Sequence, residues 1–273
     1  MPRPIITLLT DFGVADAYVG VMKGVILSIN PNAALVDLSH EVRPQAFAQA
    51  AFLLGTSYRF FPPDTVHVVV VDPGVGSERR AILLTTPHGR FVAPDNGVLS
   101  YVLRDGLAGV EPQMSGSHVA LPDGFRAWAL DNPAYWRHPV SQTFHGRDVF
   151  APVAAYLSIN TPPEAMGHET REVVWLPVAS PRWQDDALEA EVVHIDRFGN
   201  LVTSVPATLL SHTNVVVEVK GRRIVGLSRA YAEGEGLLAL IGSHGYLEVA
   251  VRNGSAASAL GSQIGDIVTV RRA

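Results

Sequence analysis

Apolar residues in the first two-thirds of the chain alternate between short continuous runs and segments with helical spacing. The runs predict strands at residues 5–10, 34–38, 66–71, 81–86 and 90–93. The helically spaced segments predict helices at 18–29, 45–57, 98–103 and 148–157. This alternation is typical of an α/β domain, and the near-continuous apolarity of 66–71 indicates a mostly parallel central sheet covered on both faces. Residues 105–142 have no sustained period, so their structure stays open.

The pattern changes after a Pro-rich stretch at 177–181 and the polar residues 184–186, which together are expected to form a linker. Short apolar segments separated by glycine-bearing turns then predict strands at 189–195, 215–219, 237–241, 246–250 and 267–271. A smaller β-barrel-like or sandwich domain is therefore expected. The predicted organisation is an N-terminal α/β catalytic domain at 1–178 and a C-terminal β domain at 187–273.

Composition narrows the function classes. The chain has 273 residues, 47% of them hydrophobic and 17% charged, which predicts a globular protein with a sizeable core. The absence of cysteine excludes disulfides, thiolate metal ligands and cysteine nucleophiles. A net charge of −5 and the lack of a basic stripe disfavour nucleic acid as a partner, so a small-molecule substrate is expected. No apolar run is long enough for a membrane span, and the default expectation is a cytoplasmic protein.

The most informative segment is 66–80, where a strongly β-branched run ends at Asp72. Pro73, Gly74 and Gly76 then turn the chain, and Arg79 follows. The carboxyl ends of buried strands are where open α/β sheets bind ligands, so Asp72 is a candidate site residue with Arg79 as its charge partner. A strand, a turn and a surface ion pair would explain the same residues without any function.

Further acids follow the predicted strands. Asp11 comes directly after the first strand, and Asp37 lies at the end of the second. If these strands are neighbours, Asp11, Asp37 and Asp72 converge. Together with Asp16 they could bind a hard cation for nucleoside or phosphoester hydrolysis. A transition-metal site is not supported because no HxxxH or HExxH spacing occurs, and neither a dinucleotide fingerprint nor a P-loop follows a strand.

Histidine and turn motifs supply weaker candidates. His145 precedes the helix predicted at 148–157, with Asp148 as its expected N-cap or first-turn acid. The segments 196–200 and 243–246 are polar turns between predicted strands. Taken alone, each is better explained by structural hydrogen bonding than by contact with a ligand.

Together these segments form an ordered set. It comprises Leu9 to Gly13 with Asp16, Val71 to Gly76 with Arg79, Ala93 to Gly97, Phe144 to Asp148, Phe198 to Asn200, and Gly242 with Ser243. The set resembles the S-adenosylmethionine hydroxide adenosyltransferases, which are hydrolase relatives of the fluorinase and chlorinase enzymes. The resemblance spans most of the chain and is specific because all the segments occur in the same order.

The resemblance implies a fold, an assembly and a site. It implies an N-terminal α/β domain, a C-terminal β-barrel-like domain, and a homotrimer whose active sites lie between one subunit's N-terminal domain and its neighbour's C-terminal domain. The implied water-activating residues are Asp72, Arg79 and His145. The implied substrate-binding residues are Asp11 at the ribose, Asp16, Asp196 and Ser243 at the methionine end, and Asn200, Val251 and Asn253 at the adenine, the last two through their backbone.

Departures from the halogenating relatives indicate the nucleophile. This chain has Asp72 and Val75 where those enzymes carry Tyr and Thr, and Gly146 where they place a halide-binding serine. His244 stands where they have an arginine for the methionine carboxylate, so the partner of that carboxylate stays open. The predicted reaction is hydrolysis of S-adenosylmethionine to adenosine and methionine, with no metal or cofactor. A metal-dependent hydrolase and a non-catalytic adenosine or S-adenosylmethionine binder remain alternatives.

Overall fold

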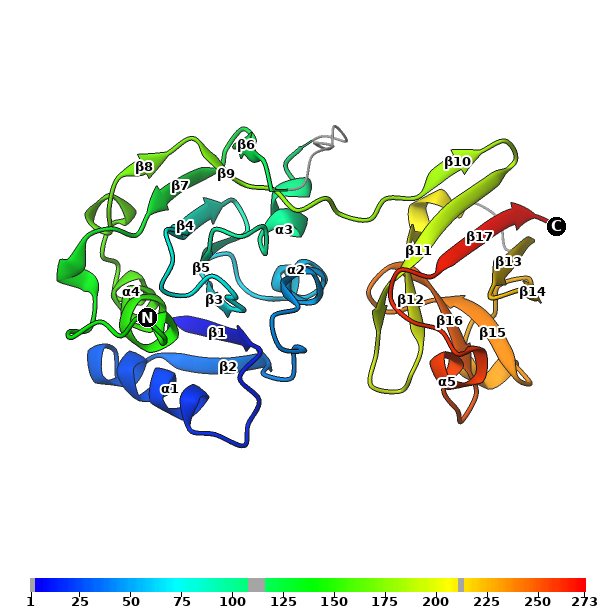
Figure 1. The fold of residues 1–273 in the computed structure, drawn as a ribbon, viewed down its shortest axis with the longest axis horizontal. Helices are drawn as coiled ribbons and strands as arrows, with labels where there is room; N and C mark the ends of the chain where they lie inside the picture. The colour runs from blue at the N-terminus through cyan, green and yellow to red at the C-terminus, as the bar shows by residue number, and fades with distance from the viewer. Residues whose placement is uncertain (1–2, 108–115, 211–213) are drawn as a thin grey trace. The chain divides into compact units, whose positions relative to one another are not determined.

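The computed structural model describes residues 3–107, 116–210 and 214–273. The chain divides into two compact units, Met1–Pro177 and Val178–Ala273 (Figure 1). The first unit combines helices with a sheet, and the second is almost entirely β. The predicted fold class is confirmed in both parts.

The first unit is built on a seven-stranded sheet in the order β2-β1-β3-β5-β4-β7-β8. Its strands are β1 (Ile5–Thr10), β2 (Ala34–Ser39), β3 (Val66–Val70), β4 (Ala81–Thr86), β5 (Gly89–Pro94), β7 (Arg126–Ala129) and β8 (Glu169–Thr170). The four strands β2, β1, β3 and β5 are parallel, and β4, β7 and β8 extend the sheet with antiparallel pairs. A separate pair joins β6 (His118–Ala120) to β9 (Glu172–Val174). Because β1 and β3 are neighbours, their carboxyl ends lie side by side.

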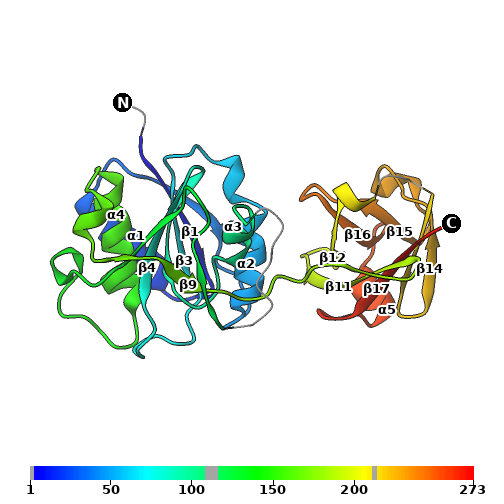
Figure 2. The same cartoon turned by 90° about the horizontal axis from the view of Figure 1, so that it is seen from above.

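Helices cover both faces of this sheet. They are α1 (Tyr18–Ile29), α2 (Phe47–Gly55), α3 (Ser100–Arg104) and α4 (Ala151–Ser158), with a π-helical turn at Gly146–Phe150 and 3-10 turns at Tyr58–Phe60, Pro133–Tyr135 and Pro163–Ala165. Figure 2 shows α1 and α4 on one face and α2 and α3 on the other. The apolar side chains of α1 and α4 pack against β1 and β3 in one buried cluster. The central strands are therefore buried on both sides, as the sequence pattern indicated.

The core of the first unit contains a titratable side chain. His67 on β3 is completely buried, its Nδ1 lies 2.8 Å from Thr7 Oγ1, and its ring stacks on Phe91. Burial lowers the pKa of His67 from 6.5 to about 4. Between these values the unfolded chain binds more protons than the folded one, so the free energy of unfolding decreases as the pH falls.

We expect acid to destabilise the protein through His67. The pKa of about 4 predicts a loss of about 3 kcal/mol of unfolding free energy as the pH falls from 6.5 through 4. Urea denaturation of the wild type and of His67→Gln at a series of pH values measures this loss. The variant is less stable at neutral pH, but its unfolding free energy is expected to depend less on pH. Identical pH dependence in the two proteins would contradict the assignment.

The second unit is a nearly closed antiparallel barrel. Seven of its eight described strands follow the order β14-β13-β17-β11-β12-β16-β15, and the eighth, β10, pairs with β11 off this path. They are β10 (Arg182–Gln184), β11 (Ala187–Ile195), β12 (Leu201–Pro206), β13 (Val215–Val219), β14 (Arg222–Val225), β15 (Leu237–Ile241), β16 (Tyr246–Val251) and β17 (Ile267–Arg272). The unit also has α5 (Ala256–Leu260) and 3-10 turns at Ala207–Leu209 and Tyr231–Glu233. Alternate residues along these strands, such as Val215, Val217 and Val219, fill its core.

Some sequence predictions need correction. The polar residues 184–186 are not a linker, because β10 and β11 form a hairpin that pairs Gln184 with Ala187. Gln45 has a φ of 65° and lies outside α2, so that helix begins later than predicted. Residues 116–142 contain β6 and β7, whereas 108–115 lie outside the described residues. No helix in the described part of the chain has both the length and the apolar character to cross a membrane.

Candidate active site

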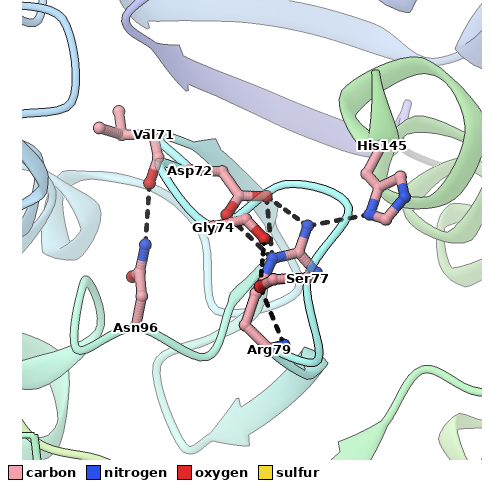
Figure 3. Close-up of polar contacts among 7 residues, drawn as sticks. All are labelled: Val71, Asp72, Gly74, Ser77, Arg79, Asn96 and His145. Atoms are coloured by element: carbon pink, nitrogen blue, oxygen red, sulfur yellow. Dashed lines mark hydrogen bonds and ion pairs between the residues drawn. The ribbon is translucent and has the colours of Figure 1, made fainter. Parts of the chain in front are cut away.

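The turn after β3 holds a buried ion pair (Figure 3). Arg79 Nε donates to both carboxylate oxygens of Asp72 at 2.9 Å, and Nη2 makes a further short contact with Oδ2. The Asp72 and Arg79 side chains are only 5% and 11% exposed, so water screens their attraction weakly. Arg79 also lies over the Phe150 ring, with Cζ 5.2 Å from the ring centroid. The structure therefore holds the Asp72 carboxylate in one fixed orientation.

His145 joins this pair from the start of the π-helical turn, far along the chain. Arg79 Nη2 lies 3.0 Å from His145 Nδ1. A guanidinium can only donate, so Nδ1 is the acceptor and Nε2 carries the proton of the neutral ring. Burial lowers the pKa of His145 and the Arg79 charge lowers it further, while Asp72 and Asp148 act in the opposite direction. Neutral His145 thus has its one lone pair engaged and its Nε2–H available to donate.

Backbone contacts hold the turn itself. Asn96 Nδ2 donates to Val71 O at 2.9 Å, and Ser77 Oγ donates to Gly74 O at 2.7 Å. Gly76 has a φ of +77°, and a Cβ there would lie 2.4 Å from Gln142 O. Gly76 therefore allows the segment leading to His145 to approach the turn directly.

The segment around His145 has its own anchor. Asp148 is fully buried, and its Oδ2 accepts hydrogen bonds from Ser141 N at 2.8 Å and from Arg147 Nη2 at 2.7 Å. Of the two expected roles of Asp148, the first-turn acid is confirmed and the N-cap is wrong, since His145 occupies the N-cap position of the π-helical turn. The Asp148 carboxylate instead ties the end of the preceding loop to the turn that follows His145.

The other acids of the first unit have separate partners. Asp11 Oδ2 accepts a hydrogen bond from Gln45 N at 2.8 Å, while Asp16 is exposed in the bend before α1. Asp37 binds Lys23 Nζ at 2.6 Å. The predicted convergence of these acids on one cation is not found: within 3–107, 116–210 and 214–273, no three His, Asp or Glu side chains are grouped to hold a metal ion.

In the second unit, Asp196 organises the turn between β11 and β12. Its Oδ1 accepts from Phe198 N and Asn200 N at 2.9 Å, and its Oδ2 accepts from Asn200 Nδ2 at 2.9 Å. Asn200 is 5% exposed, whereas Phe198 is 76% exposed. Asp196 therefore orients Asn200 and presents the Phe198 ring to solvent in this chain.

The turn between β15 and β16 carries Ser243, which is exposed, and His244. Glu248 on β16 is 2% exposed, and it accepts from Tyr231 Oη at 2.7 Å and lies 3.2 Å from His244 Nε2. Burial raises the pKa of Tyr231 to about 12, and the Glu248 hydrogen bond and charge contribute. A buried carboxylate thus holds His244 beside the predicted ligand-binding turn.

The remaining predicted positions lie at the end of β16. Val251 pairs with Leu237 of β15, and its carbonyl accepts from Gly254 N at 3.1 Å. Asn253 has a φ of 54° in the turn that follows. The structure thus groups Asp72, Arg79 and His145 in the first unit and places the other predicted residues in local turns or at strand ends of each unit.

Several residues around these positions carry no clear sequence signal. Gln142 acts through its backbone oxygen, and Tyr231 reaches Glu248 from a distant 3-10 turn. Asn96 belongs to a recognised motif, but its bond to Val71 depends on the pairing of β3 with β5. A charged residue inside the apolar strand 246–251 was the one available sign of the Glu248 cluster.

Comparisons with known proteins identify the family. The family models described as SAM hydroxide adenosyltransferase N-terminal and C-terminal domains match residues 6–167 and 190–269. A Thermus thermophilus protein named (R)-S-adenosyl-L-methionine hydrolase is 40% identical over 271 residues, covering 96% of this chain and 97% of its own. A Methanocaldococcus jannaschii protein of the same name is 35% identical and covers 90% and 87%.

A solved structure agrees with this assignment. The crystal structure of an uncharacterized conserved protein from Thermotoga maritima is 35% identical, covers 98% of this chain and 100% of its own, and has a TM-score of 0.86. The family models match most of both units, and the matched ranges include the turns described above. This chain belongs to the SAM hydroxide adenosyltransferase family.

Proposed function

We propose that the protein hydrolyses S-adenosylmethionine to adenosine and methionine by attack of water at the ribose C5′ carbon. The observation that carries this proposal is the buried arrangement of Asp72, Arg79 and His145, which can hold and activate a water molecule. Relatives named (R)-S-adenosyl-L-methionine hydrolase, similar over nearly the whole chain, support the choice of substrate.

For this hydrolysis, the main task of the protein is to position and activate the attacking water. The C5′–O bond forms as the C5′–S bond breaks, and the electron pair of the breaking bond leaves with sulfur, which turns the sulfonium into a neutral thioether. Asp72 accepts the proton of the attacking water through a lone pair that Arg79 leaves open. Arg79 keeps the carboxylate oriented, and His145 donates its Nε2–H to the water oxygen. His145 is a poor candidate for the base because its lone pair accepts from Arg79.

The remaining positions are proposed to bind substrate. Asp11 contacts the ribose hydroxyls, and Asp16, Asp196 and Ser243 hold the methionine end. The backbone of Val251 and Asn253 contacts adenine. Asn200 lies near the adenine too, in an orientation that Asp196 fixes.

One assay tests the proposal against its alternatives. Purified protein is incubated with S-adenosylmethionine, with and without chloride, and the products are identified chromatographically. Adenosine and methionine in equal amounts are expected, and the adenosine oxygen should come from labelled water. Chloroadenosine as the main product would assign halogenation. If S-adenosylmethionine binds but remains uncleaved in a single-turnover experiment, the protein is a binding protein and not a hydrolase.

We also propose that turnover needs no metal or cofactor. The leaving thioether is neutral, so no developing negative charge on a leaving group has to be stabilised. The rate of methionine release is expected to be the same after prolonged dialysis against excess EDTA as before it. A loss that added Mg²⁺ or Zn²⁺ restores would instead favour the metal-dependent hydrolase.

We propose a homotrimer, with each site completed by the neighbouring subunit, on the strength of the family resemblance. Analytical ultracentrifugation should give three times the 29.3 kDa chain mass. Mixing Asp72→Asn and Ser243→Ala chains during refolding should give more activity than either variant has alone, because some sites would then combine two unaltered units. Failure of this complementation with intact trimers would overturn the shared site. The cytoplasmic location stays a prediction that cell fractionation tests.

A further inference from the structure

The loop that follows β2 holds the turn carrying Asp11. Gly13 N donates to His40 O at 2.8 Å, and Gln45 N donates to Asp11 Oδ2 at 2.8 Å. Gln45 adopts a φ of 65° at this contact. The loop therefore fixes both the backbone of the turn and one oxygen of its carboxylate.

The His40 side chain links this turn to the neighbouring strand. Its Nδ1 lies 2.9 Å from Thr10 Oγ1, and its Nε2 lies 3.1 Å from Asp37 Oδ1. Thr10 Oγ1 in turn accepts from Phe12 N at 3.3 Å. The His40 side chain is 5% exposed, so its contact with Thr10 is shielded from water, whereas the Asp37 carboxylate is 41% exposed. These contacts attach the residues on both sides of Asp11 to β2.

One hydrogen arrangement satisfies this row of contacts. Phe12 N–H donates to Thr10, the Thr10 hydroxyl donates to His40 Nδ1, and the protonated His40 Nε2 then faces Asp37 Oδ1 at the 3.1 Å ion-pair distance. Lys23 Nζ donates to the other Asp37 oxygen at 2.6 Å. Burial raises the pKa of Asp37, but the hydrogen bonds and charges of His40 and Lys23 outweigh it and leave that pKa below its usual value. The carboxylate end of the row is therefore ionised and fixed.

A second buried histidine shows what a purely structural role looks like. His67 Nδ1 lies 2.8 Å from Thr7 Oγ1, so it also joins a threonine of β1. It lies within the sheet, against Phe91, and its threonine is not next to a site residue. His40 differs because its threonine directly precedes Asp11 and its second ring nitrogen faces a carboxylate.

We propose that His40 is a positioning residue, which holds Asp11 in the orientation that binds the ribose hydroxyls of the substrate. The inference rests on the proposed function, since it takes Asp11 as the ribose-binding carboxylate. His40 itself does not contact substrate. Its contribution passes through Thr10 and the turn, so it should affect substrate binding and depend on an intact Asp11.

A double-mutant cycle measures that dependence. The kcat and KM for S-adenosylmethionine are determined for the wild type, His40→Ala, Asp11→Asn and the double variant, with thermal unfolding of each as the folding control. His40→Ala is expected to raise KM about tenfold with little change in kcat, as loss of one buried hydrogen-bonded link would. In the Asp11→Asn background the same change should have almost no further effect.

Two further variants separate positioning from general stability. His40→Asn places an oxygen near the position of Nδ1 and should recover most of the wild-type KM. His67→Ala removes a buried histidine that also contacts a threonine of β1, and should lower the unfolding temperature without changing KM.

The outcomes distinguish this inference from the proposed function. The positioning role would be overturned if the KM increases of the two single variants multiplied in the double variant, or if His67→Ala caused the same KM change as His40→Ala. In either case the wild type would still be a hydrolase. A wild type that neither cleaves nor binds S-adenosylmethionine would overturn the proposed function itself, and this inference with it.

Discussion

Replacing Asp72 with Asn is expected to lower kcat for S-adenosylmethionine by about a thousandfold, within the range that a positioned general base contributes. The amide cannot accept a proton from water, and its NH₂ group would face the donors of Arg79. Methionine release at saturating substrate measures kcat. Calorimetric titration of the same variant with S-adenosylmethionine should show affinity close to that of the wild type, since Asp72 acts on the water.

Asp95 offers a matched control on the neighbouring arginine. Its side chain is 2% exposed, and Oδ2 accepts from Arg80 Nε at 2.9 Å and from Nη2 at 2.6 Å. Asp95→Asn therefore disrupts a buried ion pair of the same kind, and the protein should unfold at a lower temperature. Its kcat should stay near the wild-type value. Equal losses of kcat in both variants would show that Asp72 matters only for folding, and full turnover in Asp72→Asn would reject it as the base.

The sequence pattern predicted the strands that can be recognised from their own apolar residues. β1, β3 and β4 are largely apolar runs, and their bounds agree with the structure to within a residue. β12 was missed because Thr203, Ser204 and Pro206 interrupt its apolar pattern, although both hydroxyl residues are buried. β8 has only two residues and exists because β7 pairs with it. Such strands are defined by tertiary pairing, which local propensity does not contain.

The contacts of the candidate site also fall into two groups: some join residues close in the sequence, and others depend on the tertiary fold. Asp72 and Arg79 lie in one turn, seven residues apart, so their ion pair could be inferred from the segment itself. His145 is 66 residues from Arg79, and only the resemblance joined it to the pair. The contact of His40 with Thr10 and that of Tyr231 with Glu248 depend on strand order and barrel closure. Residues that bind through distant neighbours leave little trace in a single sequence.

At Gly76, an added methyl group should push the turn that carries Asp72 and Arg79 away from the segment leading to His145. A Cβ there would lie 2.4 Å from Gln142 O, which is backbone and can move only with the segment leading to His145. Gly76→Ala is therefore expected to lower kcat/KM by about a hundredfold, the usual cost of misplacing a reacting group by about 1 Å. Steady-state methionine release measures the change.

Gly124→Ala distinguishes this displacement from backbone strain. Gly124 has a φ of +80°, close to the +77° of Gly76, but a Cβ there would meet nothing within 4 Å. Both alanine variants should lose about 1 kcal/mol of unfolding free energy from the left-handed backbone. Only Gly76→Ala should also lose kcat/KM, because only there does the added carbon push against a segment of the site. Equal kcat/KM in the two variants would mean that the close approach of Gly76 to Gln142 does not position His145.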